Sequence, residues 1–567
     1  MVTPGIHRLR TLLAERPIRL PVRAGLHRPL RRNLAMIAGP VLLVLPLAAS
    51  SPLAASAPSA SGASPAASAP TVDWALAGQA SADSSGSSTP AANAIDGDAG
   101  TDWCPSAWTG TLTVDLGKVR SLDDLGITLD ATSPSANATL QVASTAGHWQ
   151  TVPAASNVAL DPGNPMYVPL PRGTQAQFAR LTVFSGTGVP VCVGELRAFG
   201  ADPAAAGMDR GADLSFTPQE LAAGATFTDR GRQASPVTIM KNNGANYVRM
   251  RLWVNPPPGY STLASDLALA RSVHAAGMKI YLDIMYSDFW ADPQHQDIPA
   301  SWAGQDLAQL TTTVQAYTQQ AISAFAKQGT PVDMVAIGNE IRNGILWPVG
   351  QVDPSAGTGY DALATLLKAG VAGAKAGNPP GHQLLIMMHY DQGGNNQLSQ
   401  AFYQNLVSRG VPFDVIGLSY YPFFHGTISQ MRANVDALAT QFHKKIIIAE
   451  TQYAWTLANG DSTGDFVWQT SQVSAGYPAS PGGQLSFVTD ELSILAQVPG
   501  GLGAGLFYWA PEWIPGVGWE PGAGTPNDNL TLFNFQGTAL PSIGIFQNPA
   551  AVCASYDPYD VPCVVGS

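Results

Sequence analysis

Apolar and polar positions follow two different patterns along the chain. Within residues 72–200, short stretches alternate between apolar and polar residues and are separated by Gly, Pro, Ser and Asp. Alternation of this kind is typical of strands with one buried and one solvated face, as in an all-β sandwich. The clearest predicted strands are residues 110–117, 125–130, 138–144 and 178–186.

From residue 208 onward, apolar runs of strand length alternate with longer stretches of helical periodicity. The clearest predicted helices are residues 266–277, 310–329, 360–377 and 428–443. The predicted strands are residues 211–215, 246–253, 279–286, 334–340, 383–390, 414–421, 445–451 and 503–509. Strands that alternate with helices in this way predict an α/β fold, a (β/α)8 TIM barrel, over residues 208–548.

Most predicted barrel strands end in polar or aromatic residues. These residues are Arg249 and Arg251, Tyr286 with Asp288, Asn339 with Glu340, His389 with Tyr390, Tyr420 with Tyr421, Glu450, and Trp509. In a (β/α)8 barrel the carboxyl ends of all strands meet at one mouth, where active sites lie. Structural capping explains one or two such residues but not a whole set, so we expect a functional site at this mouth.

Two carboxylates of this set, Glu340 and Glu450, end the fourth and the seventh predicted strands. Glycoside hydrolysis uses such a pair, and double displacement requires the two carboxyl groups within about 7 Å of one another. For Glu340 alone, the alternative is a solvated loop carboxylate, with Asn339 capping the next helix. Seven tryptophans near the upper loops suit stacking on sugar rings, although we expect about half to serve the core or lids instead: Trp290, Trp302, Trp347, Trp455, Trp509, Trp513 and Trp519.

The N-terminus predicts a signal peptide over residues 1–57. Arg31 and Arg32 precede an apolar stretch at 34–49, and small residues at 55–57 provide a cleavage site. A retained membrane anchor is the alternative, but two prolines interrupt a stretch that is already short for a membrane span. We therefore expect a secreted protein, by the general or the twin-arginine export route.

Composition adds the remaining boundaries and excludes some partners. Residues 58–71 and 201–207 are predicted linkers, and residues 549–567 a C-terminal extension. The net charge is −11, and the predicted signal is basic, so the exported part is more acidic still. Such a chain does not bind nucleic acid or an anionic membrane through charge, whereas a neutral polysaccharide is a compatible partner. We expect a monomer.

Four cysteines fit an oxidising compartment. Cys553 and Cys563 lie close together in the sequence, which favours a bond between them and a second bond between Cys104 and Cys192. Three connectivities are possible in principle.

Several long motifs of the second part resemble glycoside hydrolase family 53, the arabinogalactan endo-β-1,4-galactanases. The motifs are NYVRMRLWVNPPPGY (246–260), YSDFWADPQHQDIPASW (286–302), GNEIRNGILWPVG (338–350), DVIGLSYYPFFHGT (414–427), IIIAETQYAW (446–455), LFYWAPEWIP (506–515) and DNLTLFNFQGTALPSIGIF (528–546). The resemblance implies a (β/α)8 barrel that hydrolyses β-1,4-galactan, as in pectin side chains, with retention of configuration and no cofactor for catalysis.

The same resemblance implies roles for individual residues. Glu340 would be the acid/base and Glu450 the nucleophile, so Glu340 must start protonated and Glu450 ionised. Asn339 would bond the sugar 2-hydroxyl, and Arg249 would hold Glu450 charged. A further group would bind substrate or line the subsites, with Tyr420 hydrogen-bonded to the nucleophile: Asp288, Trp290, Trp347, His389, Tyr420 and Trp509.

Two positions depart from the family pattern. Met285 stands where the family has His, and Ala510 where it has Glu. Because a methionine cannot replace the hydrogen bonds of a histidine, we expect an altered rate or preference with activity retained. Two alternatives stay open, namely a glycan-binding protein with an impaired barrel and a retaining hydrolase of another β-linked polysaccharide.

The first part resembles the discoidin, or coagulation-factor type C, domain, which is widely used as a carbohydrate-binding module. The motifs are NAIDGDAGTDW (93–103), LTVDLG (112–117) and GELRAFG (194–200). The resemblance implies a possible structural calcium, for which the oxygen ligands would be Asp96, Asp98, Thr101 and Glu195. An Asx-turn without metal is the alternative. Parts of the barrel family also hold calcium in the last long loop, but no ligand set for it is recognised in the sequence.

Overall fold

The computed structural model of the protein describes residues 71–202, 207–256, 259–520 and 522–547. The predicted signal peptide, the C-terminal extension, and Cys553 with Cys563 lie outside these residues. Cys104 and Cys192 form a disulfide, as expected. Within the described residues, no helix is long and apolar enough to span a membrane.

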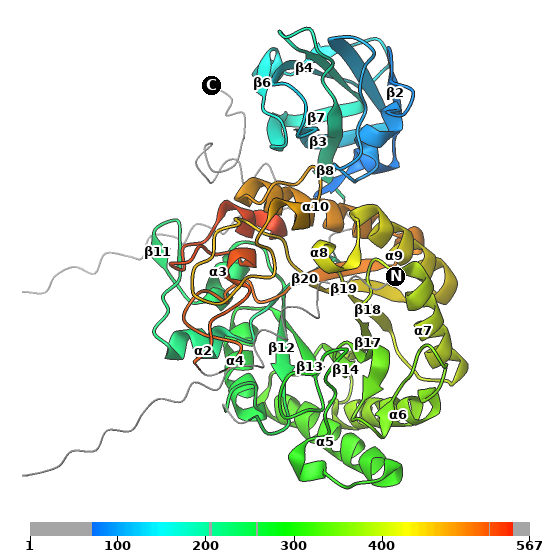
Figure 1. The fold of residues 1–567 in the computed structure, drawn as a ribbon, viewed down its shortest axis with the longest axis vertical. Helices are drawn as coiled ribbons and strands as arrows, with labels where there is room; N and C mark the ends of the chain where they lie inside the picture. The colour runs from blue at the N-terminus through cyan, green and yellow to red at the C-terminus, as the bar shows by residue number, and fades with distance from the viewer. Residues whose placement is uncertain (1–70, 203–206, 257–258, 521, 548–567) are drawn as a thin grey trace, which may run out of the picture. The chain divides into compact units, whose positions relative to one another are not determined.

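Residues 71–201 form an antiparallel β structure (Figure 1). The strands are β1 (Thr71–Asp73), β2 (Gln79–Ala82), β3 (Thr109–Leu129), β4 (Ala136–Ala143), β5 (Gln150–Thr151), β6 (Val158–Leu160), β7 (Met166–Phe184) and β8 (Val193–Ala201). The main path through the sheet is β1-β8-β3-β7-β4-β5. The strands predicted at 110–117 and 125–130 are two parts of β3, whose pairing with β7 shifts register between them. The prediction of an all-β domain is confirmed.

The second part is a closed barrel of eight parallel strands, which confirms the predicted fold class. The strands are β9 (Asp209–Asp213), β12 (Tyr247–Leu252), β13 (Lys279–Ile284), β14 (Met334–Ile337), β17 (Leu385–Tyr390), β18 (Val415–Ser419), β19 (Lys445–Thr451) and β20 (Gly503–Tyr508). Two small hairpins lie in its loops: β10 (Thr228–Asp229) with β11 (Arg232–Gln233), and β15 (Gly344–Ile345) with β16 (Gly350–Gln351).

Helices surround these strands (Figure 1). They are α2 (Thr217–Ala222), α3 (Pro236–Asn242), α4 (Leu263–Ala275), α5 (Leu307–Gln328), α6 (Tyr360–Gly377), α7 (Asn396–Ser408), α8 (Pro422–His425), α9 (Ile428–Phe442) and α10 (Pro481–Ala496). Three of them begin at capping boxes, in which the side chains of Thr262, Asp306 and Thr427 accept from the first-turn backbone. Local capping therefore sets where these helices start.

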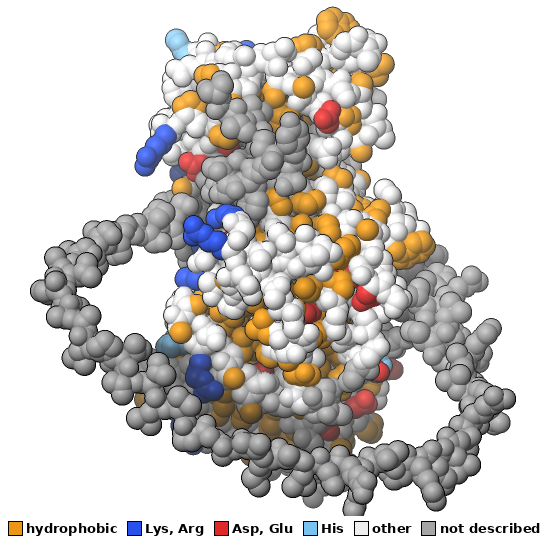
Figure 2. Space-filling view, turned by 90° about the vertical axis from the view of Figure 1, so that its left-hand side faces the viewer, with side chains coloured by type: hydrophobic (Ala, Val, Ile, Leu, Met, Phe, Trp, Pro, Cys, Tyr) orange, Lys and Arg blue, Asp and Glu red, His pale blue; other side chains and the backbone are white. Residues whose placement is uncertain are grey.

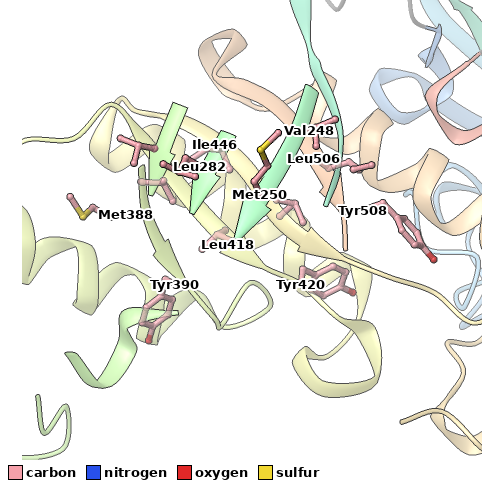
Figure 3. Packing of buried hydrophobic residues seen from close by; sticks show 14 of the residues in the cluster. Val248, Met250, Leu282, Met388, Tyr390, Leu418, Tyr420, Ile446, Leu506 and Tyr508 are labelled. Atoms are coloured by element: carbon pink, nitrogen blue, oxygen red, sulfur yellow. The ribbon is translucent and has the colours of Figure 1, made fainter. Parts of the chain in front are cut away.

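Each barrel strand is buried on both faces, and alternate residues serve two different cores. Val248, Leu282, Leu418, Ile446 and Leu506 belong to the core that the strands share with the helices (Figure 3). The residues between them fill the interior of the barrel, including Tyr247, Tyr281, Met387, Ile447 and Phe507. This alternation decides which strand-end residues can reach the mouth of the barrel.

Polar contacts also join β8 to α10. Arg197 and Asp490 form an ion pair with an Nη2–Oδ2 distance of 2.6 Å, and both side chains are almost fully buried. The Tyr477 hydroxyl donates to the same Asp490 oxygen at 2.8 Å. A buried charge that lost its partner here would be strongly destabilising.

Candidate active site

Glu450 lies near the carboxyl end of β19 and both of its carboxyl oxygens have partners. Arg249 Nη2 lies 2.6 Å from Oε1, and the Tyr421 hydroxyl donates to Oε2 at 2.7 Å. Burial raises the pKa of Glu450, while the charge of Arg249 and the hydrogen bond from Tyr421 oppose that rise. These two contacts favour the ionised form that a nucleophile requires.

Glu340 follows β14 in a left-handed backbone conformation, with φ of +47°. The Ser419 hydroxyl donates to Oε1 of Glu340 at 2.7 Å, and His389 Nε2 lies 2.9 Å from that hydroxyl. Burial raises the pKa of Glu340 well above its ordinary value, and the negative charges of Glu450 and Asp391 raise it further. The surroundings of Glu340 thus favour a protonated carboxyl.

The two carboxyl groups occupy the same part of the barrel mouth. Ser419, which contacts Glu340, is the register partner of Glu450 in the β18–β19 pairing. Within the part of the chain that the structure describes, a cation contacts Glu450 but not Glu340, so Glu450 is expected to lose its proton first. Two carboxyls whose environments separate their pKa values in this way are suited to acid and nucleophile roles in glycoside hydrolysis.

Arg249 contacts three other side chains besides Glu450. Its guanidinium is fully buried and also contacts Asp213 Oδ2 at 2.6 Å, Asp283 Oδ2 at 2.5 Å and Asn339 Oδ1 at 2.9 Å. Burial raises the pKa of Asp283 to about 7, against the opposing charge of Arg249. The predicted role of Arg249 fits this geometry, but Asp213 and Asp283 were not identified from the sequence. They lie on the inward faces of β9 and β13, the two strands that pair with the strand of Arg249. The only signal in the sequence is an acidic residue inside an apolar strand next to the strand that carries the arginine.

The Asn339 side chain is held on both sides. Its Oδ1 accepts from Arg249, and its Nδ2 donates to the Ala291 carbonyl at 2.8 Å. These contacts orient the amide beside the partners of the nucleophile. Hydrogen bonding of Asn339 to a sugar 2-hydroxyl stays a prediction.

The prediction that Tyr420 hydrogen-bonds the nucleophile is wrong, because the neighbouring Tyr421 does so. Tyr420 shares the outward face of β18 with Leu418 (Figure 3), and its hydroxyl donates to the Gly426 carbonyl at 3.0 Å. Tyr421 has the parity of Ser419 and faces the mouth. His389 is fully buried, and its Nε2 contacts the Ser419 hydroxyl that donates to Glu340.

Aromatic side chains gather beside the carboxylates. Trp290 stacks on Trp519 with ring centroids 4.3 Å apart, and Trp509 meets both rings edge-on. Trp519 is 36% exposed, whereas Trp513, under it, is fully buried. Trp290 and Trp519 therefore keep accessible ring surface, whereas Trp509 is only 8% exposed.

The two departures from the family pattern lie in two apolar clusters, and Trp290 packs against both. Met285 is 3% exposed, and its sulfur lies 3.1 Å from the indole nitrogen of Trp253. Ala510 is fully buried in a cluster with Trp509 and Trp513. Both replacements therefore make the surroundings of Trp290 more apolar.

Two predicted substrate-binding residues make hydrogen bonds within the protein. The Asp288 oxygens accept from the backbone amides of Asn255 and Ala300 at 3.0 Å and 2.8 Å, which joins two loops. The Trp347 indole donates to the Asn343 carbonyl at 2.8 Å. Trp302 is 7% exposed and packs edge-on against Tyr317. Substrate binding by Asp288 and Trp347 stays a prediction.

Asp96, Asp98 and Thr101, three of the four predicted calcium ligands, belong to one loop of the β sandwich, and Glu195 contacts that loop. Thr101 Oγ1 donates to Asp96 at 2.8 Å, and the Gly97 amide donates to Glu195 Oε1 at 2.5 Å. The Asp98 side chain instead accepts from Gly100 and, at 2.7 Å, from Ser429. Glu195 is fully buried, and its Oε2 has no hydrogen-bond partner among the described residues, which suits a cation. Calcium at this loop stays a prediction.

A second acidic cluster lies between the loops after β19 and β20. It contains Asp461, Asp465, Asn527 and Asp528, and both Asp465 oxygens and Asp528 Oδ1 are buried without hydrogen-bond partners among the described residues. Burial and the charges of neighbouring acids raise the pKa of Asp465 and of Asp528 to about 7. Such a donor set fits calcium, although it was not recognised in the sequence, because two distant loops supply it. The three Asp carboxylates are not all within 4.8 Å of one another, so an ion would need further oxygens, such as those of Asn527.

Calcium is expected to raise the melting temperature through this second cluster, and chelation to lower it. Without the ion, the raised pKa values mean that the folded state binds more protons than the unfolded state between about pH 4 and pH 7. Stability in chelator is therefore expected to fall as the pH rises through that window. At a calcium concentration 100 times Kd, binding would contribute about 2.7 kcal/mol.

Thermal melts of Asp528→Asn and Glu195→Gln, with calcium and with chelator, separate the two candidate sites. Asp528→Asn is expected to lose most of the calcium-dependent shift and to flatten the pH dependence in chelator. If Asp528→Asn keeps the full shift while Glu195→Gln abolishes it, the ion binds only in the sandwich.

Comparison with known proteins covers both parts of the chain. A model of glycosyl hydrolase family 53 matches residues 209–546, and a model of the F5/8 type C domain matches residues 79–194. The probable arabinogalactan endo-beta-1,4-galactanase A of Neosartorya fischeri is 38% identical over 313 residues, which cover 54% of this chain and 84% of that protein.

Two further matches cover nearly the whole length of the matched protein or domain. The arabinogalactan endo-beta-1,4-galactanase of Thermothelomyces thermophilus is 34% identical over 345 residues, which cover 60% of this chain and 98% of that protein. The solved GH53 catalytic domain of Ignisphaera aggregans has a TM-score of 0.57 at 35% identity, and the match covers 61% of this chain and 96% of that domain. The matched region contains both Glu340 and Glu450.

Proposed function

Because the chain belongs to glycosyl hydrolase family 53 and is thus a glycoside hydrolase, we propose that it is a secreted, retaining endo-β-1,4-galactanase. The observation that carries the proposal is the unequal environment of the two carboxyl groups. Arg249 and Tyr421 stabilise the negative charge of Glu450, whereas Glu340 is partly buried and has no cation in contact among the described residues. Retaining glycosidases need this division between nucleophile and acid.

In the first step, Glu340 gives its proton to the glycosidic oxygen while a Glu450 oxygen attacks the anomeric carbon. The bond to the leaving sugar breaks, and a covalent glycosyl ester forms on Glu450. Arg249 and the Tyr421 hydroxyl keep the attacking carboxylate oriented up to this point. The Asn339 amide, fixed by Arg249 and Ala291, lies where it would bond the 2-hydroxyl as the transition state forms.

In the second step, Glu340 is ionised and removes a proton from water, which attacks the anomeric carbon and releases Glu450. Each step inverts the anomeric carbon, so the product retains the β configuration. No cofactor is needed, because all charge and proton transfers use the two carboxyls and water.

The proposed substrate, β-1,4-galactan, is an uncharged polymer. The relatives from Neosartorya fischeri and Thermothelomyces thermophilus are described as arabinogalactan endo-beta-1,4-galactanases. Figure 2 shows that apolar and uncharged side chains make up most of the face drawn there. The F5/8 type C domain would hold the enzyme near its polymer, which raises the local substrate concentration without a catalytic contact.

Product analysis tests the proposal. On β-1,4-galactan the enzyme is expected to release reducing ends from within the chain, and proton NMR is expected to show the β anomer first. Glu450→Gln is the inactive control. If wild type and control match on galactan but differ on another β-linked glycan, the hydrolase acts on that glycan. If they match on all glycans while titration calorimetry shows galactan binding, the barrel only binds.

A further inference from the structure

Asp391 is a buried carboxylate at the mouth of the barrel that the mechanism above does not use. It follows β17 directly, shares the inward parity of His389, and is 4% exposed. Arg342 Nη1 lies 3.0 Å from its Oδ2, and Gln392 Nε2 donates to the same oxygen at 3.0 Å. Its Oδ1 is buried and has no hydrogen-bond partner among the described residues.

Arg342 connects Asp391 to the proposed acid/base. It lies two residues after Glu340 in the turn Ile341–Asn343, and its amide donates to the Glu340 carbonyl at 2.9 Å. The ion pair therefore joins the end of β17 to the turn that carries Glu340.

That turn needs support from outside. A non-glycine residue in the left-handed region, such as Glu340 at φ of +47°, costs about 1 kcal/mol or more and persists only where neighbouring structure holds it. The side-chain amide of Asn343 donates to the Pro293 carbonyl at 2.7 Å, and the side-chain amide of Gln296 donates to the Asn339 carbonyl at 2.9 Å. The pair of Arg342 and Asp391 is a charged contact in this set of anchors.

We propose that Asp391 is a positioning residue for the acid/base, because it fixes the turn of Glu340 through Arg342. Its negative charge also opposes ionisation of Glu340. The inference rests on the proposed function, in which Glu340 must begin each cycle protonated. Removing the charge of Asp391 should therefore weaken acid catalysis without touching the nucleophile.

The charged groups around both residues support this assignment. Glu450 of β19, Asp391 beyond β17 and Asp292 of the loop after β13 all raise the pKa of Glu340, after the larger effect of burial. Burial raises the pKa of Asp391 itself, and the charge of Arg342 opposes this, so the ion pair favours the carboxylate. Because two other acids and burial remain when Asp391 is neutral, we expect a partial change.

Asp391→Asn tests the electrostatic part. Activity falls as the pH rises through the pKa of Glu340, so lowering that pKa moves the alkaline limb of kcat/KM to lower pH. We expect a shift of about half a unit to one unit. The matched control is Asp361→Asn, which removes another arginine–aspartate pair: Asp361 is 92% exposed and pairs with Arg409. The control should leave the limb in place.

A substrate with an activated leaving group separates positioning from general damage. A dinitrophenyl β-galactobioside needs no proton from Glu340 in the first step, so Asp391→Asn should slow galactan hydrolysis at least several-fold more than hydrolysis of this substrate. Arg342→Lys keeps both charges but changes the geometry, so it should show the same preference with an unshifted limb. Arg342→Lys also tests the proposal if Asp391→Asn fails to fold.

Superimposable pH profiles for wild type and Asp391→Asn, or equal losses on both substrates, would overturn the proposal. The result stays separate from the test of function. If wild type hydrolyses no galactan, the proposed function fails, and carbon-13 NMR titration of Glu340 then decides the role of Asp391. An unchanged Glu340 titration in Asp391→Asn would reject it.

Discussion

Glutamine in place of Glu450 is expected to lower kcat/KM on β-1,4-galactan by on the order of 10⁴-fold or more. The amide has nearly the same volume but cannot attack the anomeric carbon, so the covalent intermediate does not form. Arg249 keeps Asp213 and Asp283 as partners, so the fold should persist. Steady-state rates on galactan and a circular dichroism spectrum together measure both expectations.

Azide distinguishes the two carboxyl roles. In Glu450→Ala, azide can occupy the space of the missing nucleophile and attack an activated galactoside once, which gives the α-glycosyl azide. In Glu340→Ala, Glu450 still forms the glycosyl ester, and azide then replaces water in the second step, which gives the β-glycosyl azide. Product NMR reads the anomer directly. If Glu450→Ala gives the β-glycosyl azide and Glu340→Ala gives the α-glycosyl azide, the assignments of Glu340 and Glu450 are reversed.

The sequence predicted the barrel well because its signals are local. Apolar runs of strand length, helical periodicity and polar strand ends each depend on a few neighbouring residues, and the eight predicted strands all occur in the barrel. The order of strands then follows from the fold class. Glu340 and Glu450 could be selected because they end two of those strands.

The orientation of single side chains was less predictable. Tyr420 and Tyr421 are chemically identical neighbours, and the register shift after Leu418 obscures which of them faces the mouth. The alternation of β18 decides it, since Ser419 is inward and Tyr420 packs outward. The hydrogen bonds of Asp288 were missed for a different reason: nothing in the sequence shows that backbone amides of two other loops would donate to its oxygens.

Partners that are distant in sequence were missed altogether. Asp213 and Asp283 flank Arg249 from two other strands, and Asp391 reaches Glu340 through Arg342. The acidic cluster of Asp461, Asp465 and Asp528 joins loops more than sixty residues apart. Pairing across such distances is set by the closed sheet and its loops, which no local pattern encodes.

Methionine in place of Arg249 is expected to destabilise the protein by about 3–5 kcal/mol, because it leaves several buried acids without their cation. Asp213, Asp283 and Glu450 all lie within 2.6 Å of this guanidinium, and all three side chains are nearly or fully buried. Without the positive charge the pKa values of Asp283 and Glu450 rise, so the folded variant binds more protons than its unfolded state at neutral pH. Its stability should therefore increase as the pH falls from 8 towards 5.

Urea unfolding at pH 5 and pH 8 measures both effects, with Arg409→Met as the control. Arg409 pairs with Asp361 at the same 2.6 Å distance, but that aspartate is 92% exposed, so the control should lose less than about 1 kcal/mol. Equal losses in the two variants would show that burial of the charge network is unimportant. A loss confined to Arg249→Met, larger at pH 8, would mean that one guanidinium both stabilises the barrel and keeps the nucleophile ionised. In that case no substitution of Arg249 could improve stability without also changing the chemistry of Glu450.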